Sequence, residues 1–172
     1  MADTLTTLKT RRSCRAYTSE HVEEEKLNAI IEAGTYAATG MGKQSPIILV
    51  IKDPAVHEQL RKLNAAAMGM DIDTFYGAPD LLVVLANKDI PTYIYDGSLV
   101  MGNMMNAAAD LGVASCWVHR AKEEFESEEG KVILKKLGIE GDYEGIGNLI
   151  LGYAAKPAAE AAPRKADYIY SI

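Results

Sequence analysis

The sequence predicts a domain of the α+β class, in which helices and strands share one core. Segments with apolar residues at helical spacing occur along the chain together with short, continuous apolar runs of strand length. The 172 residues fit one domain that can bury a sizeable core, and a hydrophobic content of 48% is ordinary for a globular protein. The pattern therefore indicates one folded domain, without internal repeats.

The first half of the chain is predicted to hold three helices and one strand. Asp3 or Thr4 can cap a short helix that ends near the first arginines, and residues 23–37 place apolar side chains on one helical face. Residues 47–52 are apolar up to a final lysine, which predicts a strand buried on both faces. An aspartate followed by proline then starts a helix over residues 54–66.

The second half is predicted to alternate strands and helices around one long helix. Residues 93–111 are rich in Gly, Ala, Met and Asn with few charges, so this helix is expected to be buried nearly all round. Its small residues suit a subunit interface, and a plain central core helix is equally compatible with them. The other expected elements are strands at 81–86, 113–119 and 144–154 and helices at 122–125 and 127–137.

The C-terminal residues differ in character from the rest. Residues 155–164 are rich in Ala and Pro and should be extended, and residues 168–172 (Tyr-Ile-Tyr-Ser-Ile) are β-prone. An extended arm that ends in a strand finds little surface on the domain of its own chain to pack against. We therefore expect a domain at 1–154 and an arm at 155–172 that adds to the sheet edge of a second chain.

Charge and cysteine content disfavour several classes of protein. The formal net charge of −6 argues against nucleic-acid binding, which needs a basic surface. No apolar run approaches membrane-spanning length and the first residues lack signal-peptide features, so we expect a cytoplasmic protein without a membrane partner. Cys14 and Cys116 form no CxxC or Cys/His grouping, which argues against a disulfide framework and a metal site. Both are expected to act as small buried hydrophobes.

A basic pentapeptide is the first candidate for a binding site. Residues 11–15 read Arg-Arg-Ser-Cys-Arg and offer three guanidiniums and a hydroxyl directly after a short helix. Guanidinium groups match phosphate oxygens bidentately, which a lone lysine cannot do. An exposed basic helix end explains the same residues, since cations complement the negative end of the helix dipole.

A loop of small residues before the first strand is the second candidate. Ala38, Thr39 and Gly40 let the backbone approach a flat ligand closely, and Gln44 offers the donor and acceptor that a pyrimidine edge requires. A helix C-cap followed by an irregular turn explains this loop equally well. His119 is similarly open to two interpretations, a ligand contact or a surface residue at the end of a strand.

Taken together, these segments resemble the nitroreductase family of FMN-dependent NAD(P)H oxidoreductases in its short single-domain form. Residues 11–15 are similar to the family's RRSxR motif, and residues 96–117 resemble its central helix and following strand. Further matches occur in the expected order: Gly77-Ala78-Pro79, Gly152-Tyr153 and Pro163-Arg164-Lys165. The small-residue loop departs from the family's commoner pattern, with Gly42 where asparagine is usual, although Gln44 keeps its register.

The resemblance implies an α/β/α sandwich with a central, mainly antiparallel sheet flanked by helices. It also implies an intertwined homodimer with two tightly bound FMN molecules at the interface and with the C-terminal strand exchanged between subunits. The residues implied to hold phosphate and ribityl oxygens are Arg11, Arg12, Ser13, Arg15, Arg164 and Lys165. Those implied near the ribityl group or the ring are Asn64, Gln44, the turn of Trp117, Val118 and His119, and the covering residues Ala38, Thr39 and Gly40 of the other subunit.

The resemblance further implies a ping-pong reaction without a catalytic side chain. NADH or NADPH would reduce FMN, and a nitroaromatic, quinone or similar conjugated acceptor would then be reduced at the same face, with the cofactor carrying the chemistry. Two other classes of protein stay open. A non-catalytic FMN-binding redox sensor or flavin store would use the same pocket, and an α+β interaction module would bind no flavin. Flavin colour, and its bleaching by NAD(P)H, separates the three.

Overall fold

The computed structural model describes residues 3–172. The elements are α1 (Thr4–Thr10), α2 (Glu24–Thr35), the 3-10 helix η1 (Gly40–Gly42), β1 (Pro46–Ile51), α3 (Pro54–Ala67), β2 (Asp80–Asn87), α4 (Tyr93–Asp110), β3 (Ala114–Val118), α5 (Ala121–Glu126), α6 (Glu128–Lys136) and β4 (Tyr143–Gly152). Every expected element of the domain is present, with bounds close to those predicted. Among the residues that the structure describes, no helix is both long and apolar enough to span a membrane.

The four strands form one antiparallel sheet in the order β1-β2-β4-β3. In its middle, Val83 of β2 lies between Leu49 of β1 and Asn148 of β4. The consecutive residues Val84 and Leu85 of β2 pair with Gly147 and Gly145 of β4. The residue between these two glycines is therefore one extra residue in β4, and it forms a β-bulge. The two buried strands, β2 and β4, thus lie at the centre of the sheet, and β1 and β3 form its edges.

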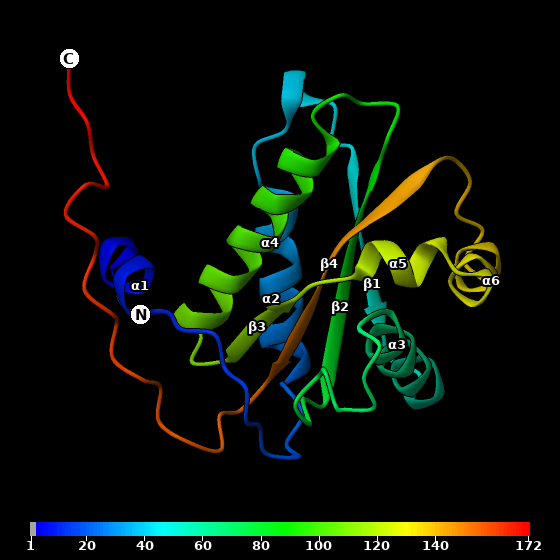
Figure 1. Cartoon of the computed structure of the whole chain (residues 1–172), viewed down its shortest axis with the longest axis horizontal. Coiled ribbons are helices and arrows are strands. Elements are labelled where there is room, and N and C mark those ends of the chain that lie inside the picture. The colour runs from blue at the N-terminus through cyan, green and yellow to red at the C-terminus, as the bar shows by residue number, and fades with distance from the viewer. Residues whose placement is uncertain (1–2) are drawn as a thin grey trace.

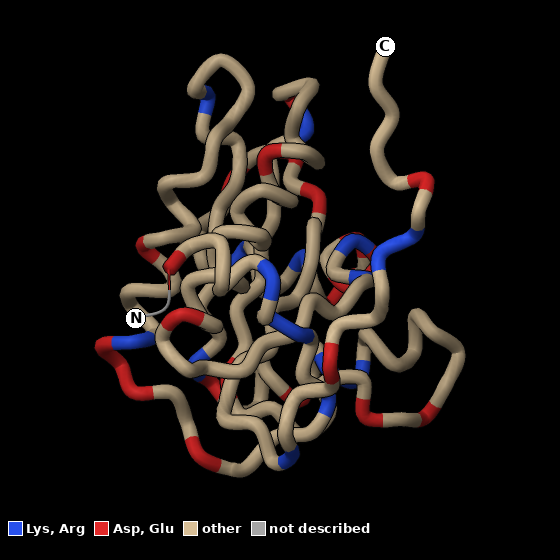
Figure 2. The backbone as a smooth tube through the Cα atoms, turned by 90° about the vertical axis from the view of Figure 1, so that its left-hand side faces the viewer, with Lys and Arg blue, Asp and Glu red and all other residues tan. Residues whose placement is uncertain are grey.

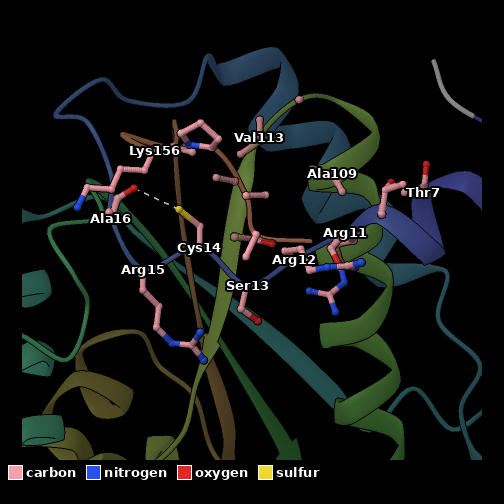
Figure 3. Close-up of a pocket in the computed structure, with 18 residues that line it drawn as sticks. Thr7, Arg11, Arg12, Ser13, Cys14, Arg15, Ala16, Ala109, Val113 and Lys156 are labelled. Carbon is pink, nitrogen blue, oxygen red and sulfur yellow. Dashed lines mark hydrogen bonds between the residues drawn. The ribbon is translucent and has the colours of Figure 1, made fainter. Parts of the chain in front are cut away.

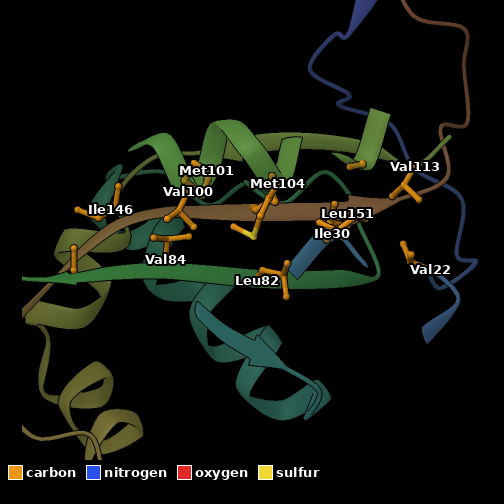
Figure 4. Packing of buried hydrophobic residues seen from close by; sticks show 13 residues of the cluster. Val22, Ile30, Leu82, Val84, Val100, Met101, Met104, Val113, Ile146 and Leu151 are labelled. Atoms are coloured by element: carbon orange, nitrogen blue, oxygen red, sulfur yellow. The ribbon is translucent and has the colours of Figure 1, made fainter. Parts of the chain in front are cut away.

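Helices cover both faces of the sheet and enclose one core on each side (Figure 1). On one face, Ile30 of α2 and Met101 and Met104 of α4 pack against Leu82 and Val84 of β2 (Figure 4). The intervening residues of β2 face the second core, beneath α3, α5 and α6, because side chains alternate along a strand. The predicted α/β/α sandwich with an antiparallel sheet is confirmed.

Two expectations about burial are wrong for the single chain. β1 was expected to be buried on both faces, but it lies at the edge of the sheet and Val50 is 37% exposed. α4 was expected to be buried nearly all round, but Ile94, Tyr95 and Leu99 lie on its outer face and Leu99 is 50% exposed. The sheet and α2 cover one side of α4, and no element among residues 3–172 buries Ile94, Tyr95 or Leu99 on its outer side.

The C-terminal arm leaves the sheet after β4 and runs past α1 (Figure 1). Residues 155–172 form no strand in this chain, and Tyr168, Ile169 and Tyr170 are exposed. The addition of the arm to a second chain stays a prediction.

Candidate functional site

The arginine-rich segment begins where α1 ends and runs beside the first half of β3. The Asp3 side chain caps α1, which ends at Thr10, so residues 11–15 follow the helix directly. Ser13 forms a parallel β-bridge with Ser115, and the Cys14 N–H donates to the Ser115 carbonyl oxygen at 2.9 Å. The sheet therefore fixes the backbone from which the three arginines project.

A cavity of about 520 Å³ opens along this segment (Figure 3). Its walls come from the end of α1, residues 11–16, the end of α4 with the start of β3, and the first residues of the C-terminal arm. Among the described residues that line it are three arginines and Lys156, but no Asp or Glu. Figure 2 looks onto the side of the molecule where α1 and the arm lie, and shows basic positions in the middle of that face. The chain is acidic overall, yet this cavity is basic.

Two guanidinium nitrogens at this cavity lack a protein partner. Arg12 Nη1 donates to the carbonyl oxygens of Lys9 at 2.9 Å and Arg11 at 2.6 Å. Arg12 Nε and Arg11 Nη1 are buried, and within residues 3–172 neither has a hydrogen-bond partner. Buried donors on charged groups are costly when unpaired. Phosphate oxygens form charge-assisted hydrogen bonds with guanidinium groups, so a phosphate fits the charge and the donors of the arginines at this cavity.

β3 connects the arginine segment to a turn formed by Val118, His119 and Arg120. Ser13 pairs with Ser115, so three residues of β3, or roughly 10 Å, separate the arginine segment from the start of this turn at Val118. Arg120 has φ 78°, a left-handed conformation that is uncommon for a residue other than glycine. The His119 carbonyl oxygen accepts a hydrogen bond from Asn64 Nδ2 at 2.6 Å. Asn64, on α3, thus holds the turn from the second core.

Asn64 belongs to a buried polar cluster with Glu124 and Asn148. Both side-chain amide nitrogens donate to Glu124 Oε1, that of Asn148 at 2.7 Å. All three side chains are buried, and Glu124 is 1% exposed. Burial raises the pKa of Glu124 to about 8, although the hydrogen bonds from Asn64 and Asn148 act in the opposite direction. Burial thus favours the neutral form of this carboxyl.

The small-residue loop at 38–46 is held by one buried carboxylate, Asp96 of α4. Asp96 accepts hydrogen bonds from the Gly40 N–H at 2.9 Å, Ser45 Oγ at 2.8 Å and Thr92 Oγ1 at 3.1 Å. Burial acts to raise the pKa of Asp96, but these hydrogen bonds outweigh it and hold the pKa below its usual value. A Cβ atom on Gly40 would lie 2.2 Å from Thr92 Oγ1, so this close approach requires glycine.

Thr39 and Gln44 line a different cavity, of about 410 Å³, between α2 and β1. Gln44 has a positive φ of 49°, so the loop turns sharply before the strand begins. Neither residue lines the arginine cavity. A contribution of this loop to the site of a second subunit stays a prediction.

Comparison with known proteins agrees with this geometry. The model of the nitroreductase family matches residues 8–153. The chain belongs to the nitroreductase family. It is similar to the crystal structure of a nitroreductase with bound FMN from Bacteroides fragilis, with a TM-score of 0.89, 28% identity and 100% of each chain covered. A nitroreductase with bound FMN from Desulfitobacterium hafniense gives a TM-score of 0.87 at 26% identity, again over 100% of each chain.

A relative from Archaeoglobus fulgidus is 28% identical over 159 residues. The match covers 89% of this chain and 86% of the relative, which is itself named only provisionally as an NADH dehydrogenase/NAD(P)H nitroreductase.

The structure of this nitroreductase-family chain brings together only part of the predicted site. Arg11, Arg12, Ser13 and Arg15 line one cavity, but Arg164 and Lys165 do not. These two lie exposed on the arm, where Arg164 Nη2 donates to the Ala162 carbonyl oxygen at 2.6 Å.

Cys14 lines the arginine cavity and is only partly buried, whereas the sequence predicts a buried hydrophobe. Cys116 is buried as expected, and burial raises the pKa of its thiol.

Three residues of the site were missed by sequence reasoning. Lys156 lines the arginine cavity. The sequence feature that could have indicated it is a single cation in a stretch rich in Ala and Pro. Asp96 has a weaker signal, one acid in the first turn of a helix whose other charged residue is Asp110 at its end. Glu124 has none, because residues 122–129 are so rich in charge that all of them read as an exposed helix face.

Proposed function

We propose that this protein is an FMN-dependent NAD(P)H oxidoreductase. The observation that carries the proposal is the pair of buried guanidinium nitrogens, Arg11 Nη1 and Arg12 Nε, which lack partners among the described residues at a cavity without acidic lining. A phosphate dianion fits this charge and this donor set. The similar structures from B. fragilis and D. hafniense contain FMN, a ligand that combines such a phosphate with a flat ring.

The residues of one chain provide for the two ends of such a ligand. Arg11, Arg12 and Ser13 would bind the phosphate. Arg15 extends on the opposite side of Ser13 from the other two arginines (Figure 3), so it would reach the ribityl group rather than the same phosphate oxygens. The turn of Trp117, Val118 and His119, at the far end of β3, would face the N5 side of the ring.

A second copy of the chain would complete the site. The outer face of α4 exposes Ile94, Tyr95 and Leu99, and a cluster of large apolar side chains on one helix is typical of a subunit interface. The β-prone end of the arm would add to the free edge of β1 in the partner. The residues that we assign to the second subunit's contribution are Ala38, Thr39, Gly40, Gln44, Arg164 and Lys165.

When bound, FMN supplies the redox chemistry, accepting a hydride from NADH or NADPH and delivering it to a nitroaromatic, quinone or similar conjugated acceptor. The chain's own residues bind and orient. The arginines neutralise the phosphate, Asn64 fixes the backbone at His119, and Asp96 fixes the loop that includes Gly40. No side chain is assigned as acid, base or nucleophile.

The first test is the visible spectrum of the purified protein under anaerobic conditions. Bleaching of a flavin band by NADH or NADPH, reversed by a quinone or nitroarene, is the expected result. A flavin band that neither nucleotide bleaches would instead support a non-catalytic flavin-binding protein. A protein that binds no FMN, even when FMN is supplied, would refute the proposal.

The second test is FMN affinity in the variant Arg11→Gln. Removing one charge-assisted hydrogen bond of about 1.5–3 kcal/mol should weaken binding by about tenfold to 150-fold. Lys135→Gln, an exposed residue of α6, is the matched control with the same change of charge and should bind FMN normally. Equal affinities of the two variants would contradict the assignment of the phosphate site.

A further inference from the structure

The cluster of Glu124, Asn64 and Asn148 has too many acceptors for its donors. Glu124 Oε1 accepts from both amide nitrogens. Three other oxygens, Glu124 Oε2, Asn64 Oδ1 and Asn148 Oδ1, are buried, and the described residues offer them no hydrogen-bond partner. A hydrogen atom on Glu124 Oε2 would turn one of these three acceptors into a donor. It could then pair with one of the amide oxygens.

Reversing the amide of Asn64 does not remove this imbalance. Asn64 Nδ2 donates to the His119 carbonyl oxygen as well as to Glu124. A backbone carbonyl can only accept, so the nitrogen of Asn64 must face His119. The orientation of Asn64 is thereby set by the backbone, and within the cluster the carboxyl group is the one that can supply the missing donor by taking up a proton.

The surroundings of Glu124 also favour a neutral carboxyl. Its carboxyl makes no salt bridge to any residue among 3–172. From α3 and β4 it meets the neutral amides of Asn64 and Asn148. The charged groups that act on it are Glu123 of its own helix and Arg120 of the preceding turn, with opposite effects. A buried carboxylate without a cation is costly.

The turn that this cluster supports is constrained at two further points. Arg120 is held in a left-handed conformation. On the other side, a Cβ atom on Gly145 would lie 2.2 Å from the carbonyl carbon of Ala121, so β4 packs directly on the backbone there. Asn64 holds the same turn at His119, and Glu124 holds Asn64. A change at Glu124 can therefore move the turn without touching a ligand.

We propose that Glu124 is a neutral, buried carboxylic acid that acts as a positioning residue, holding Asn64 and through it the turn of Val118, His119 and Arg120, beside which the flavin ring would bind. The second half of this inference rests on the proposed function, since it needs bound FMN. The first half, the proton on Glu124, concerns the protein alone. Ionisation of Glu124 would place a negative charge beneath the turn and make reduction of the flavin less favourable.

The proton is tested without reference to flavin. Infrared spectra should show the carbonyl band of a protonated carboxyl in the wild type and in Glu126→Gln, an exposed control on the same helix, but not in Glu124→Gln. A group whose pKa is raised on folding stabilises the protein fully below its unfolded pKa, here 4.5, and this contribution is lost as pH rises to the folded pKa of about 8. The urea midpoint of the wild type should therefore fall further between about pH 5 and about pH 8, inside this window, than that of Glu124→Gln.

Positioning is tested by comparing Glu124→Gln with Glu124→Ala. The amide of glutamine accepts from both asparagines and donates as the protonated acid does, so FMN affinity at pH 7 should stay within about twofold of the wild type. Alanine removes the acceptor that both amide nitrogens share, so Asn64 keeps only its bond to His119 and affinity should fall by about tenfold or more. The midpoint potential of the flavin should show an extra fall above about pH 8 in the wild type and in Glu126→Gln, but not in Glu124→Gln.

Failure of each half gives a different result. A missing infrared band, or a urea midpoint whose pH dependence Glu124→Gln leaves unchanged, refutes the neutral acid whether or not FMN binds. Equal FMN affinity in the alanine and glutamine variants, or equal pH dependence of the potential in all variants, refutes the positioning role. A wild-type protein that binds no FMN refutes the proposed function and the positioning role, while the infrared and urea measurements still decide the protonation of Glu124.

Discussion

Replacing Asp96 by alanine should loosen the loop at 38–46 and destabilise the whole domain. Asp96 is 2% exposed. Among the described residues, its carboxylate is the only one that accepts hydrogen bonds from Gly40 and Ser45 of this loop. Its removal leaves the Gly40 N–H and the buried Ser45 hydroxyl without their acceptor. Thr92 loses a longer hydrogen bond, of 3.1 Å, and can turn toward solvent.

The expected loss follows from these three hydrogen bonds. A hydrogen bond to a charged group contributes about 1.5–3 kcal/mol, and the two short ones, at 2.8 and 2.9 Å, are expected near the lower end because Gly40 is only partly buried. Their sum gives a decrease of about 3–4 kcal/mol in the free energy of unfolding. Asp96→Asn keeps the shape and one acceptor oxygen, so its decrease should be about 1–2 kcal/mol.

Urea denaturation at a fixed protein concentration measures these differences, since the stability of a dimer depends on concentration. Asp89→Asn, an exposed residue, is the control and should stay within about 0.5 kcal/mol of the wild type. Because its pKa is lowered, Asp96 stabilises the fold above its unfolded pKa of 3.8, and this contribution is lost as pH falls through its folded pKa. An alanine variant that loses less than about 1 kcal/mol, or that matches the asparagine variant, would refute the reasoning.

Two further substitutions test the packing of the second core. In Gly145→Ala the added methyl group meets the backbone of Ala121 at 2.2 Å, so the free energy of unfolding should fall by about 2–3 kcal/mol. A Gly145→Ala protein as stable as the wild type would contradict the contact. Ser127→Ala removes the cap that accepts from the Gly130 N–H at 3.0 Å and should cost about 1 kcal/mol in urea titrations, and an unchanged midpoint would show that the cap contributes nothing.

Local signals predicted the order and type of the elements, because those signals lie in consecutive residues. The Asp53-Pro54 pair starts α3 where expected, and Ser127 caps α6. The apolar run of β2 is fully buried because that strand is central to the sheet. The run of β1 looks the same in sequence, but its place at the edge is a property of strand order, which local patterns do not contain.

The candidate site was predicted only where its residues are consecutive. Arg11, Arg12, Ser13 and Arg15 lie together on one segment, and one cavity contains all four. Asn64 was expected near the ligand, but its link to Glu124 joins residues sixty positions apart and depends on how α3 and α5 meet beneath the sheet. No spacing rule within one helix or strand reveals such a contact.

The outer edge of β1 has a consequence for the behaviour of the chain at high concentration. Pro46–Ile51 is an apolar strand that pairs with β2 on one side only, and the structure places no other strand of residues 3–172 on its second side. An uncovered apolar edge is a template for uncontrolled pairing between molecules, and apart from its first proline this strand carries no residue that discourages it. Truncation after residue 154 is therefore expected to cause aggregation under conditions in which the domain itself stays folded. The residues that would join two subunits would also protect each of them from fibrous assembly.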